Sequence, residues 1–371
     1  MLNEINGKPA QALESPGKIY IYGDYLFINE INKGVHVIDN SNPSNPVNKS
    51  FINIPGNVDI AVKGNILFAD IYTDLLTLDI SNPLATRVTS VTSNVFPERR
   101  YGNGFIADNS QYIVGWNRKD TTVPVEDLQE CSSCGIVFDA QNFSSAAAVT
   151  KATVGIAGSM SRFSVINNYM YAVNISSLKV FDIANPESPK SVKEVSPGFG
   201  IETIYPFGDK LFLGGTNGMF IYDISNAANP TYVSAFAHAR FCDPVVTDGD
   251  YAYVTLRAGS VCGGMQNSEL NILDIKQLNA PKLVERYNMS NPYGLGKDGN
   301  LLWICDGAAG LKLYDASNPK AIQLKKVFSN IEPFDVIPYN GKLIVSAKEG
   351  IIQYSYSPAG QMTEVSRLQT K

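Results

Sequence analysis

Histidine, the side chain that most often transfers protons near neutral pH, occurs only twice in the 371-residue chain, as His36 and His238. Arg240 and Asp243 follow His238 closely in the sequence, but no obvious nucleophile accompanies them. Motifs of phosphate-binding loops, zinc proteases and serine hydrolases (G-x-x-x-x-G-K-[ST], H-E-x-x-H and G-x-S-x-G) do not occur in the sequence. The sequence therefore disfavours catalysis and predicts no cofactor and no metal site.

Arginine and aromatic residues are better placed to bind a ligand. When the repeating units described below are aligned, charged residues fall at the start of the innermost strand, and others lie in the loops before it or in two long insertions. Gathered at a channel mouth, such side chains could bind a carboxylate, a sugar or a peptide. The candidate ligand-binding residues are Lys18, Asp59, Arg100, Trp116, Arg162, Glu202, His238, Arg240, Arg257, Tyr293 and Asp335.

A structural interpretation of four of these residues stays open. Lys18, Asp59, Arg162 and Asp335 carry charges of both signs at equivalent positions. They could form a self-neutralising ring that lines a water-filled channel, because structural networks also gather charges. The two long insertions could likewise be solvated loops without a partner.

Catalysis at the same channel mouth is the second alternative. A lyase or hydrolase of an anionic sugar-like substrate could hold that substrate with Arg100, Arg162 and Arg240, because guanidinium groups stabilise negative charge. The residues then available for proton transfer would be His238, Tyr293 and Glu202.

Four of the five cysteines fall in predicted loops. Cys131 and Cys134 lie in one long insertion, whereas Cys242 precedes an inner strand and Cys262 lies in the insertion of the same repeat. We expect two disulfides, Cys131–Cys134 and Cys242–Cys262, which fit an oxidising compartment. Zinc binding and redox catalysis are weaker alternatives, because the single C-x-x-C lacks a partner pair and does not join a strand to a helix. Cys305, inside LLWIC, is predicted to be a buried thiol.

A motif of the form D-I-S-N-P recurs about every forty residues along the whole chain. Because Asp followed by Ser, Asn and Pro is typical of turns, we expect each carboxylate to accept nearby backbone N–H groups rather than to act in catalysis. The clear copies contain Asp39, Asp79, Asp182, Asp223, Asp274 and Asp315, and the two weaker copies contain Asp139 and Ser355.

Each repeat also contains four short runs rich in Val, Ile, Tyr and Phe, bounded by Gly, Asn, Asp or Pro, which predict four β-strands. Units of about forty residues with four strands are typical of a β-propeller. We expect one all-β domain over residues 1–371 with eight four-stranded blades, and seven blades are the alternative. The predicted blades are 15–54, 55–95, 96–155, 156–198, 199–237, 238–288, 289–329 and 330–371.

The repeated third strand resembles that of the LVIVD-repeat proteins, seen here as Leu76-Thr-Leu-Asp79-Ile-Ser-Asn-Pro83 and its sister copies. The resemblance covers almost the whole chain and departs from the pattern at Ser355 and at Ala140-Gln141-Asn142. It implies a propeller that is exported or attached to the surface of a bacterial or archaeal cell, and it implies no defined activity.

Composition narrows the range of partners. With 30 Lys and Arg against 35 Asp and Glu, the net charge is −5, so nucleic acid is not an expected partner. No apolar run is long enough to span a membrane. The N-terminus lacks the basic start and apolar run of a signal peptide, so we expect any lipid anchor to be attached through a segment absent from this chain. We therefore expect a non-catalytic periplasmic or cell-surface propeller that binds a glycan, peptide or protein through its loop-rich face.

Overall fold

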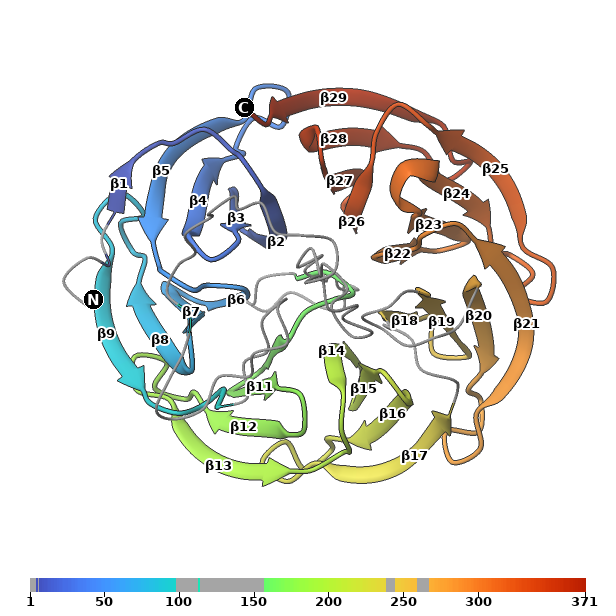
Figure 1. Cartoon of the computed structure of the whole chain (residues 1–371), viewed down its shortest axis with the longest axis horizontal. Coiled ribbons are helices and arrows are strands. Elements are labelled where there is room, and N and C mark those ends of the chain that lie inside the picture. Colours follow the sequence, from blue (N-terminus) through green and yellow to red (C-terminus); the bar gives the residue numbers. More distant parts are fainter. Residues whose placement is uncertain (1–4, 6, 98–112, 114–156, 238–243, 259–266) are drawn as a thin grey trace, which may run out of the picture.

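The computed structural model describes residues 5, 7–97, 113, 157–237, 244–258 and 267–371. Within these residues the chain forms seven antiparallel sheets, six of four strands and one of five. The sheets stand around a central axis as the blades of a β-propeller, and Figure 1 looks down that axis. In each blade four consecutive strands run from the innermost to the outermost position, and in the five-stranded blade the N-terminal strand β1 is added outside β5.

The blades are numbered here in chain order. Blade 1 contains β1 (Gly7–Pro9), β2 (Pro16–Tyr22), β3 (Tyr25–Glu30), β4 (Gly34–Asp39) and β5 (Val47–Asn53), and blade 2 contains β6 (Ile60–Lys63), β7 (Ile66–Ile71), β8 (Asp74–Asp79) and β9 (Arg87–Thr92). Blade 3 contains β10 (Phe163–Ile166), β11 (Tyr169–Val173), β12 (Leu178–Asp182) and β13 (Lys190–Val195). Blade 4 contains β14 (Ile201–Phe207), β15 (Lys210–Gly215), β16 (Gly218–Asp223) and β17 (Thr231–Ala237).

Blades 5 to 7 complete the ring. Blade 5 contains β18 (Val245–Thr247), β19 (Tyr251–Leu256), β20 (Ser268–Asp274) and β21 (Lys282–Met289). Blade 6 contains β22 (Leu295–Asp298), β23 (Leu301–Cys305), β24 (Leu311–Asp315) and β25 (Gln323–Phe328). Blade 7 contains β26 (Pro333–Tyr339), β27 (Lys342–Ala347), β28 (Gly350–Tyr356) and β29 (Met362–Gln369). One 3-10 helix, η3 (Gly307–Ala309), lies in blade 6. No helix of the described residues is long and apolar enough to cross a membrane.

The expectation of eight blades is wrong, and the structure has the seven blades of the alternative. Blade 2 packs directly against blade 3, although about seventy residues separate β9 from β10 in the sequence. Lys63 Nζ, at the end of β6, lies 2.8 Å from both Asn168 Oδ1 and Ile183 O of blade 3. Because this seam is closed, a blade from 96–155 has no position between its neighbours, and nearly all of that repeat lies outside the described residues.

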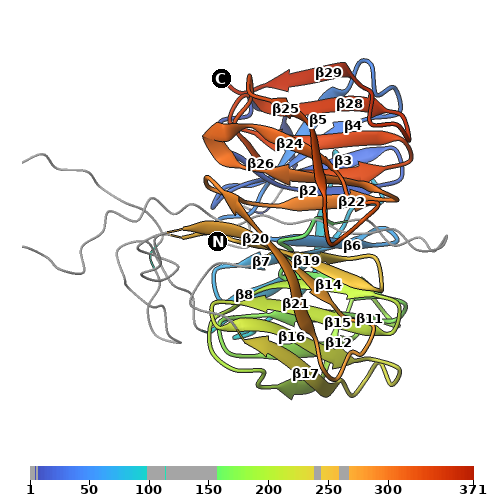
Figure 2. The same ribbon diagram turned by 90° about the vertical axis from the view of Figure 1, so that its right-hand side faces the viewer.

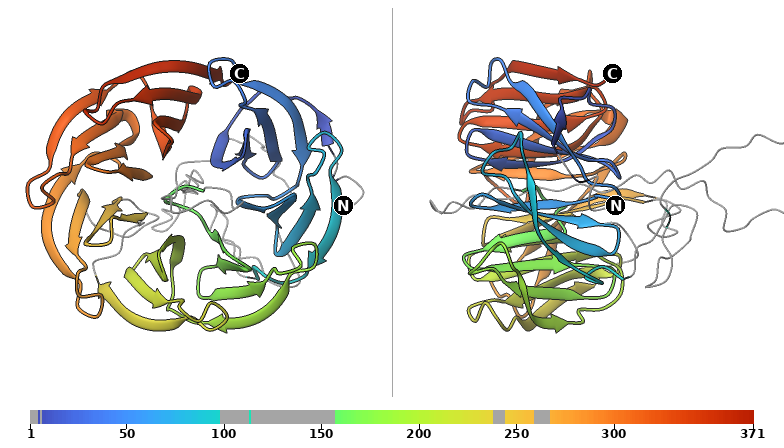
Figure 3. Two further views of the ribbon diagram at one scale, coloured as in Figure 1. Left: turned by 180° about the vertical axis from the view of Figure 1, so that it is seen from behind. Right: turned by 90° about the vertical axis from the view of Figure 1, so that its left-hand side faces the viewer.

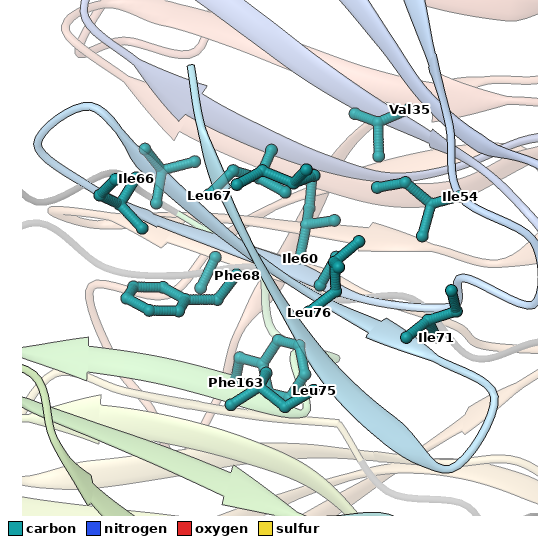
Figure 4. Packing of buried hydrophobic residues seen from close by; sticks show 14 of the residues in the cluster. Val35, Ile54, Ile60, Ile66, Leu67, Phe68, Ile71, Leu75, Leu76 and Phe163 are labelled. Atoms are coloured by element: carbon teal, nitrogen blue, oxygen red, sulfur yellow. The ribbon is translucent and has the colours of Figure 1, made fainter. Parts of the chain in front are cut away.

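The core lies between blades rather than within one blade. All six residues of β7 are buried, whereas the outer strand β13 is exposed along nearly its whole length. Near-continuous apolar runs in the second strands follow from this arrangement, because both faces of such a strand are covered. Figure 4 shows the result at blade 2, where Val35 and Ile54 of blade 1 and Phe163 of blade 3 lie on either side of the side chains of blade 2.

The motif aspartates form turns at the ends of the third strands, as predicted. In each of the six clear copies, Oδ1 accepts the backbone N–H of the second residue after the aspartate, at 2.8–3.1 Å. In blade 4, hydrogen bonds from the Ser225 hydroxyl and from Lys210, together with the Ser225 N–H, lower the pKa of Asp223 to about 2. The aspartates are therefore structural.

These turns also connect neighbouring blades. Ser50 Oγ of blade 1 donates to Pro83 O in the turn of blade 2 at 3.1 Å, and Tyr171 Oη of blade 3 donates to Ala227 O in the turn of blade 4 at 2.8 Å. The last blade joins the first in the same way, because the Gln353 side chain exchanges hydrogen bonds with the Asn40 side chain at 2.7 and 3.2 Å. The repeat motif thus explains both the blade and the contact that closes the ring.

Candidate functional site

The ring has two distinct faces. Figure 2 shows the ring edge-on, so that the faces lie to the left and right. On one face, called the loop face here, the inner strands begin and the hairpins between second and third strands turn. On the opposite face, the third strands end in the D-I-S-N-P turns. The described residues that flank the gaps at 98–156, 238–243 and 259–266 belong to the loop face, because each gap precedes an inner strand or joins a second strand to a third.

Seven of the predicted ligand-binding residues are described, and all lie at or next to the expected strands. Lys18, Glu202 and Asp335 lie within two residues of the start of inner strands β2, β14 and β26; Asp59, Arg162 and Tyr293 precede β6, β10 and β22; and Arg257 follows β19. Outside the described residues lie Arg100, Trp116, His238 and Arg240, and the four predicted disulfide cysteines, Cys131, Cys134, Cys242 and Cys262.

Lys18, Asp59, Asp70 and Arg162 form what we call the seam cluster, where blades 1, 2 and 3 meet. Lys18 Nζ lies 2.7 Å from Asp59 Oδ2, and both side chains are almost completely buried, with exposed fractions of 1% and 2%. Asp59 Oδ2 also accepts the backbone N–H of Arg162 at 2.5 Å. Burial lowers the pKa of Lys18, and the ion pair with Asp59 opposes that effect.

Asp70 and the Arg162 side chain complete the seam cluster. Asp70 Oδ1 accepts hydrogen bonds from the N–H groups of Val58 and Asp59 at 2.7 and 2.8 Å, and so fixes the loop that leads into β6. Arg162 Nη1 lies 3.9 Å from Asp70 Oδ2, and its guanidinium carbon is 5.4 Å from the centre of the Phe96 ring. The seam cluster thus brings two carboxylates and two cations together and links three blades through their contacts.

A short segment, Ala157–Ser161, crosses the centre of the ring from blade 3, where Figure 1 shows it in green. Leu295 N of blade 6 donates to Ser159 Oγ at 3.1 Å, and Ile204 N of blade 4 donates to Ser161 O at 2.7 Å. Ser159, Met160 and Ser161 are all buried. The segment therefore fills part of the region that the structural alternative assigned to a water-filled channel.

Asp335 lies apart from the seam cluster. Its Oδ1 faces Gly294 of blade 6 so closely that a Cβ atom at Gly294 would lie 2.5 Å from it. The absence of a side chain at Gly294 therefore creates the space that the buried Asp335 carboxylate occupies. Of the four residues in the predicted charge ring, the structure brings Lys18, Asp59 and Arg162 together and places Asp335 at the seam of blades 6 and 7.

An arginine–tyrosine cluster, formed by Arg257, Asn291, Tyr293 and Phe334, lies on the loop face where blades 5, 6 and 7 meet. The guanidinium carbon of Arg257 is 4.3 Å from the centre of the Tyr293 ring, a cation–π arrangement. Tyr293 also meets the Phe334 ring edge to face at 5.6 Å, and Asn291 Nδ2 donates to its hydroxyl at 3.2 Å. Arg257 is only 7% exposed, so its main effect is to fix the half-buried Tyr293.

Asp306 is a buried residue that the sequence interpretation missed. Its carboxylate accepts the N–H groups of Ser290 and Asn291 at 3.0 and 2.8 Å, and Lys312 Nζ lies 2.5 Å away. Asp306 directly follows β23, the second strand of blade 6. Asp70 has a similar position in blade 2, at the end of the apolar run ILFAD in the second strand β7. A polar residue at the end of such a run is the signal that could have identified both.

Cys305 is a free, fully buried thiol, as predicted, and burial together with the nearby carboxylates of Asp335 and Asp306 raises its pKa well above the usual value. In the described part of the chain, no group of three or more His, Cys, Asp or Glu side chains could hold a metal ion.

Solved structures resemble this fold over nearly the whole chain. A protein from Lactobacillus plantarum matches with 13% identity and a TM-score of 0.60, and the alignment covers 96% of each chain. The periplasmic gluconolactonase of Pseudomonas aeruginosa matches with 12% identity and a TM-score of 0.59, covering 95% of this chain and 96% of that one. These identities are low enough that the likeness shows the fold alone.

A bacterial surface component of the type-IX secretion system of Porphyromonas gingivalis matches with 12% identity and a TM-score of 0.51, covering 96% of this chain and 39% of that protein. No curated protein sequence matches the chain significantly. The model of the LVIVD repeat, by contrast, matches residues 16–53, 56–86, 157–196, 208–237 and 242–289. With its motif turns, its four-stranded blades and these five matched segments, the chain belongs to the LVIVD-repeat family.

Proposed function

We propose that this protein is a non-catalytic, exported or surface-attached propeller that binds a glycan, peptide or protein partner through its loop face. The residue that best supports this proposal is Phe199, which lies before β14 on that face and is 57% exposed. Aromatic residues are frequent energetic centres of interfaces, which makes an exposed phenylalanine on the loop face a candidate contact residue.

The backbone around Phe199 holds it in place. Gly198 and Gly200 have φ values of +142° and +86°, and a Cβ at Gly200 would lie 1.9 Å from Thr216 Oγ1. Gly200 N donates to Ile175 O at 2.6 Å, and Asn217 Nδ2 donates to Phe199 O at 3.3 Å. A phenyl group displayed by a fixed loop loses little conformational entropy on binding, which favours affinity.

Two further residues of the loop face add to the proposal. Arg162, on the adjacent blade, keeps its guanidinium partly exposed while its backbone is fixed by Asp59. Tyr293, across the face, is held by Arg257 and Asn291. Phenylalanine, tyrosine and arginine are enriched at interfaces, so their presence on this face supports the proposal.

A binding screen against glycan and peptide arrays tests the proposal, with Phe199→Ala as the diagnostic variant. Tyr232→Ala is the matched control, because Tyr232 is 59% exposed but lies on β17, the outer strand of blade 4. We expect Phe199→Ala to weaken binding of any ligand found at least tenfold, which corresponds to about 1.4 kcal/mol, and Tyr232→Ala to leave it unchanged. Equal effects of the two variants would contradict the proposal.

Export is part of the same proposal. It is supported by the resemblance of the fold to a periplasmic gluconolactonase and to a bacterial surface component. Cell fractionation with an antibody against this chain would test it, and recovery of the protein in the cytosol alone would contradict it.

An enzyme is the second candidate, because one structural neighbour is a gluconolactonase and the fixed Tyr293 hydroxyl lies on the same face. A lyase or hydrolase of an anionic sugar-like substrate would lose its turnover in Tyr293→Phe while keeping its fold. Assays with sugar lactones and uronate-containing glycans distinguish the two functions. Binding without turnover supports the non-catalytic binding protein, whereas turnover that is abolished in Tyr293→Phe supports the enzyme.

A further inference from the structure

The N-terminal residues 7–15, called the strap here, run from the outer edge of blade 1, beside blade 2, to the junction of blades 1 and 7 near the C-terminus (Figure 3). The strap begins with β1, which pairs with the outer strand β5 of blade 1. Further along, Leu13 forms a β-bridge with Thr370, and Lys371 N donates to Leu13 O at 2.8 Å. Leu13 is buried among isoleucines of blades 1 and 7. The strap thus closes the ring where its two ends meet.

A buried polar network in blade 1 holds the strap at two points. Glu30, at the end of β3, accepts the backbone N–H groups of Glu14 and Ser15 at 3.2 and 2.5 Å. His36 Nε2, on β4, lies 3.0 Å from the Glu30 carboxylate. Asn48, on β5, donates through Nδ2 to Gln11 O of the strap at 2.7 Å, and the same atom lies 3.4 Å from His36 Nδ1. The glutamate and histidine are almost completely buried.

The two ring nitrogens of His36 face different groups. Nε2 faces the Glu30 carboxylate, to which a ring N–H can donate, and Nδ1 faces the side-chain amide of Asn48. The two oxygens of Glu30 face three donors, which stabilise the ionised carboxylate. Burial acts to raise the pKa of Glu30, but hydrogen bonds from His36 and from the N–H groups of Glu14 and Ser15 outweigh it, so that the pKa is lower than usual.

We propose that Glu30, His36 and Asn48 form a charge-dependent latch that holds the strap against blade 1 and thereby keeps the ring closed. Removing the charge of Glu30, by acid or by mutation, weakens its contacts with the Glu14 and Ser15 N–H groups and loosens the strap where blades 1 and 7 meet. The other charged groups that face the carboxylate are few: Lys33 Nζ lies 3.9 Å from Glu30 Oε1 and 2.5 Å from Glu14 Oε2, at the solvent-exposed edge of the network.

The direction of the pH dependence follows from the lowered pKa of Glu30. A carboxyl group whose pKa is lower in the folded than in the unfolded protein stabilises the fold at any pH above its pKa in the unfolded protein, which is about 4.3 for glutamate. That contribution to stability is lost as the pH falls through the pKa of the group in the folded protein. The latch is therefore closed at neutral pH and opens only in acid below the usual carboxyl range.

Hydrogen exchange of the whole chain, measured peptide by peptide, tests the latch. In Glu30→Gln at pH 7 we expect amides of residues 7–15 to exchange at least tenfold faster than in the natural chain, while amides of blades 3 to 5 keep their rates. Glu14→Gln is the control, because the Glu14 side chain is 58% exposed and its backbone N–H remains available to Glu30. Unchanged strap exchange in Glu30→Gln, or equal acceleration in all blades, would overturn the proposal.

The unmutated protein gives a second measurement that does not depend on folding of a variant. After correction for intrinsic rates, strap amides should lose protection as the pH is lowered below about 4.3, before amides of blades 3 to 5 do so. Simultaneous loss in every blade would show that the ring opens by global unfolding and that no local latch exists.

Discussion

Breaking the ion pair of the seam cluster is expected to destabilise the propeller in a way that depends on which partner is removed. In Asp59→Asn, the ammonium group of Lys18 stays buried without its carboxylate. Removing one member of a buried pair costs about 3–5 kcal/mol. The pair in this protein meets that description, with 2.7 Å between Nζ and Oδ2 and at most 2% exposure of either side chain.

The converse change, Lys18→Met, should cost less. Methionine fills most of the space of the lysine side chain, and Asp59 keeps its hydrogen bond from the Arg162 N–H at 2.5 Å. We expect a loss of about 2 kcal/mol, the contribution of a hydrogen bond to a charged group. The double variant should cost about 2–3 kcal/mol, well below the sum of the single changes, because neither a buried ammonium nor a buried carboxylate then remains unpaired.

Guanidinium denaturation at pH 7, followed by tryptophan fluorescence and circular dichroism, measures the three free energies of unfolding. Coincident transitions by the two probes are required before a free energy is assigned to so large a protein. If the double variant costs the sum of the single variants to within about 0.5 kcal/mol, Lys18 and Asp59 do not interact as described, and the seam cluster does not stabilise the junction of the three blades.

Three further outcomes are expected. Asp223→Ala should lower the denaturation midpoint, because the Ser225 and Lys210 contacts are lost, while ligand affinity stays unchanged; reduced affinity would contradict a purely structural aspartate. Thiol titration of denatured, unreduced protein should detect one thiol, Cys305, and five free thiols would refute both predicted disulfides. Burial raises the pKa of Tyr314 to about 12, so stability should fall as the pH rises above about 10, where unfolded tyrosine ionises; denaturation midpoints independent of pH between 9 and 12 would contradict this.

The repeat made most of the fold predictable from the sequence. The apolar runs located the strands, because each run is short and bounded by Gly, Asn, Asp or Pro, which break strands. Ring size was not predictable in the same way. The sequence contains eight copies of the repeat, but whether one copy enters the ring depends on contacts across a seam, such as those from Lys63 to blade 3, which no single repeat encodes.

The candidate site was predictable in position but not in role. Alignment of the repeats correctly placed Lys18, Asp59 and Arg162 at the starts of adjacent inner strands. Their burial and their mutual pairing follow from the packing of three blades, which the alignment does not contain. The partnership of Glu30 with His36 was missed for a similar reason, because it depends on a strap that comes from outside the repeat.

The segment that crosses the centre of the ring has a consequence for the order of folding. Ser159 follows blade 2 in the chain, but its hydroxyl oxygen accepts a hydrogen bond from the backbone N–H of Leu295, 136 residues later. Contacts between residues so distant in sequence form slowly, because a long loop must close first. During synthesis, the contact of Ser161 with Ile204 of blade 4 can form first, whereas that of Ser159 must wait until the first strand of blade 6 has left the ribosome. The blades are thus made one after another, but the centre that they surround is completed late.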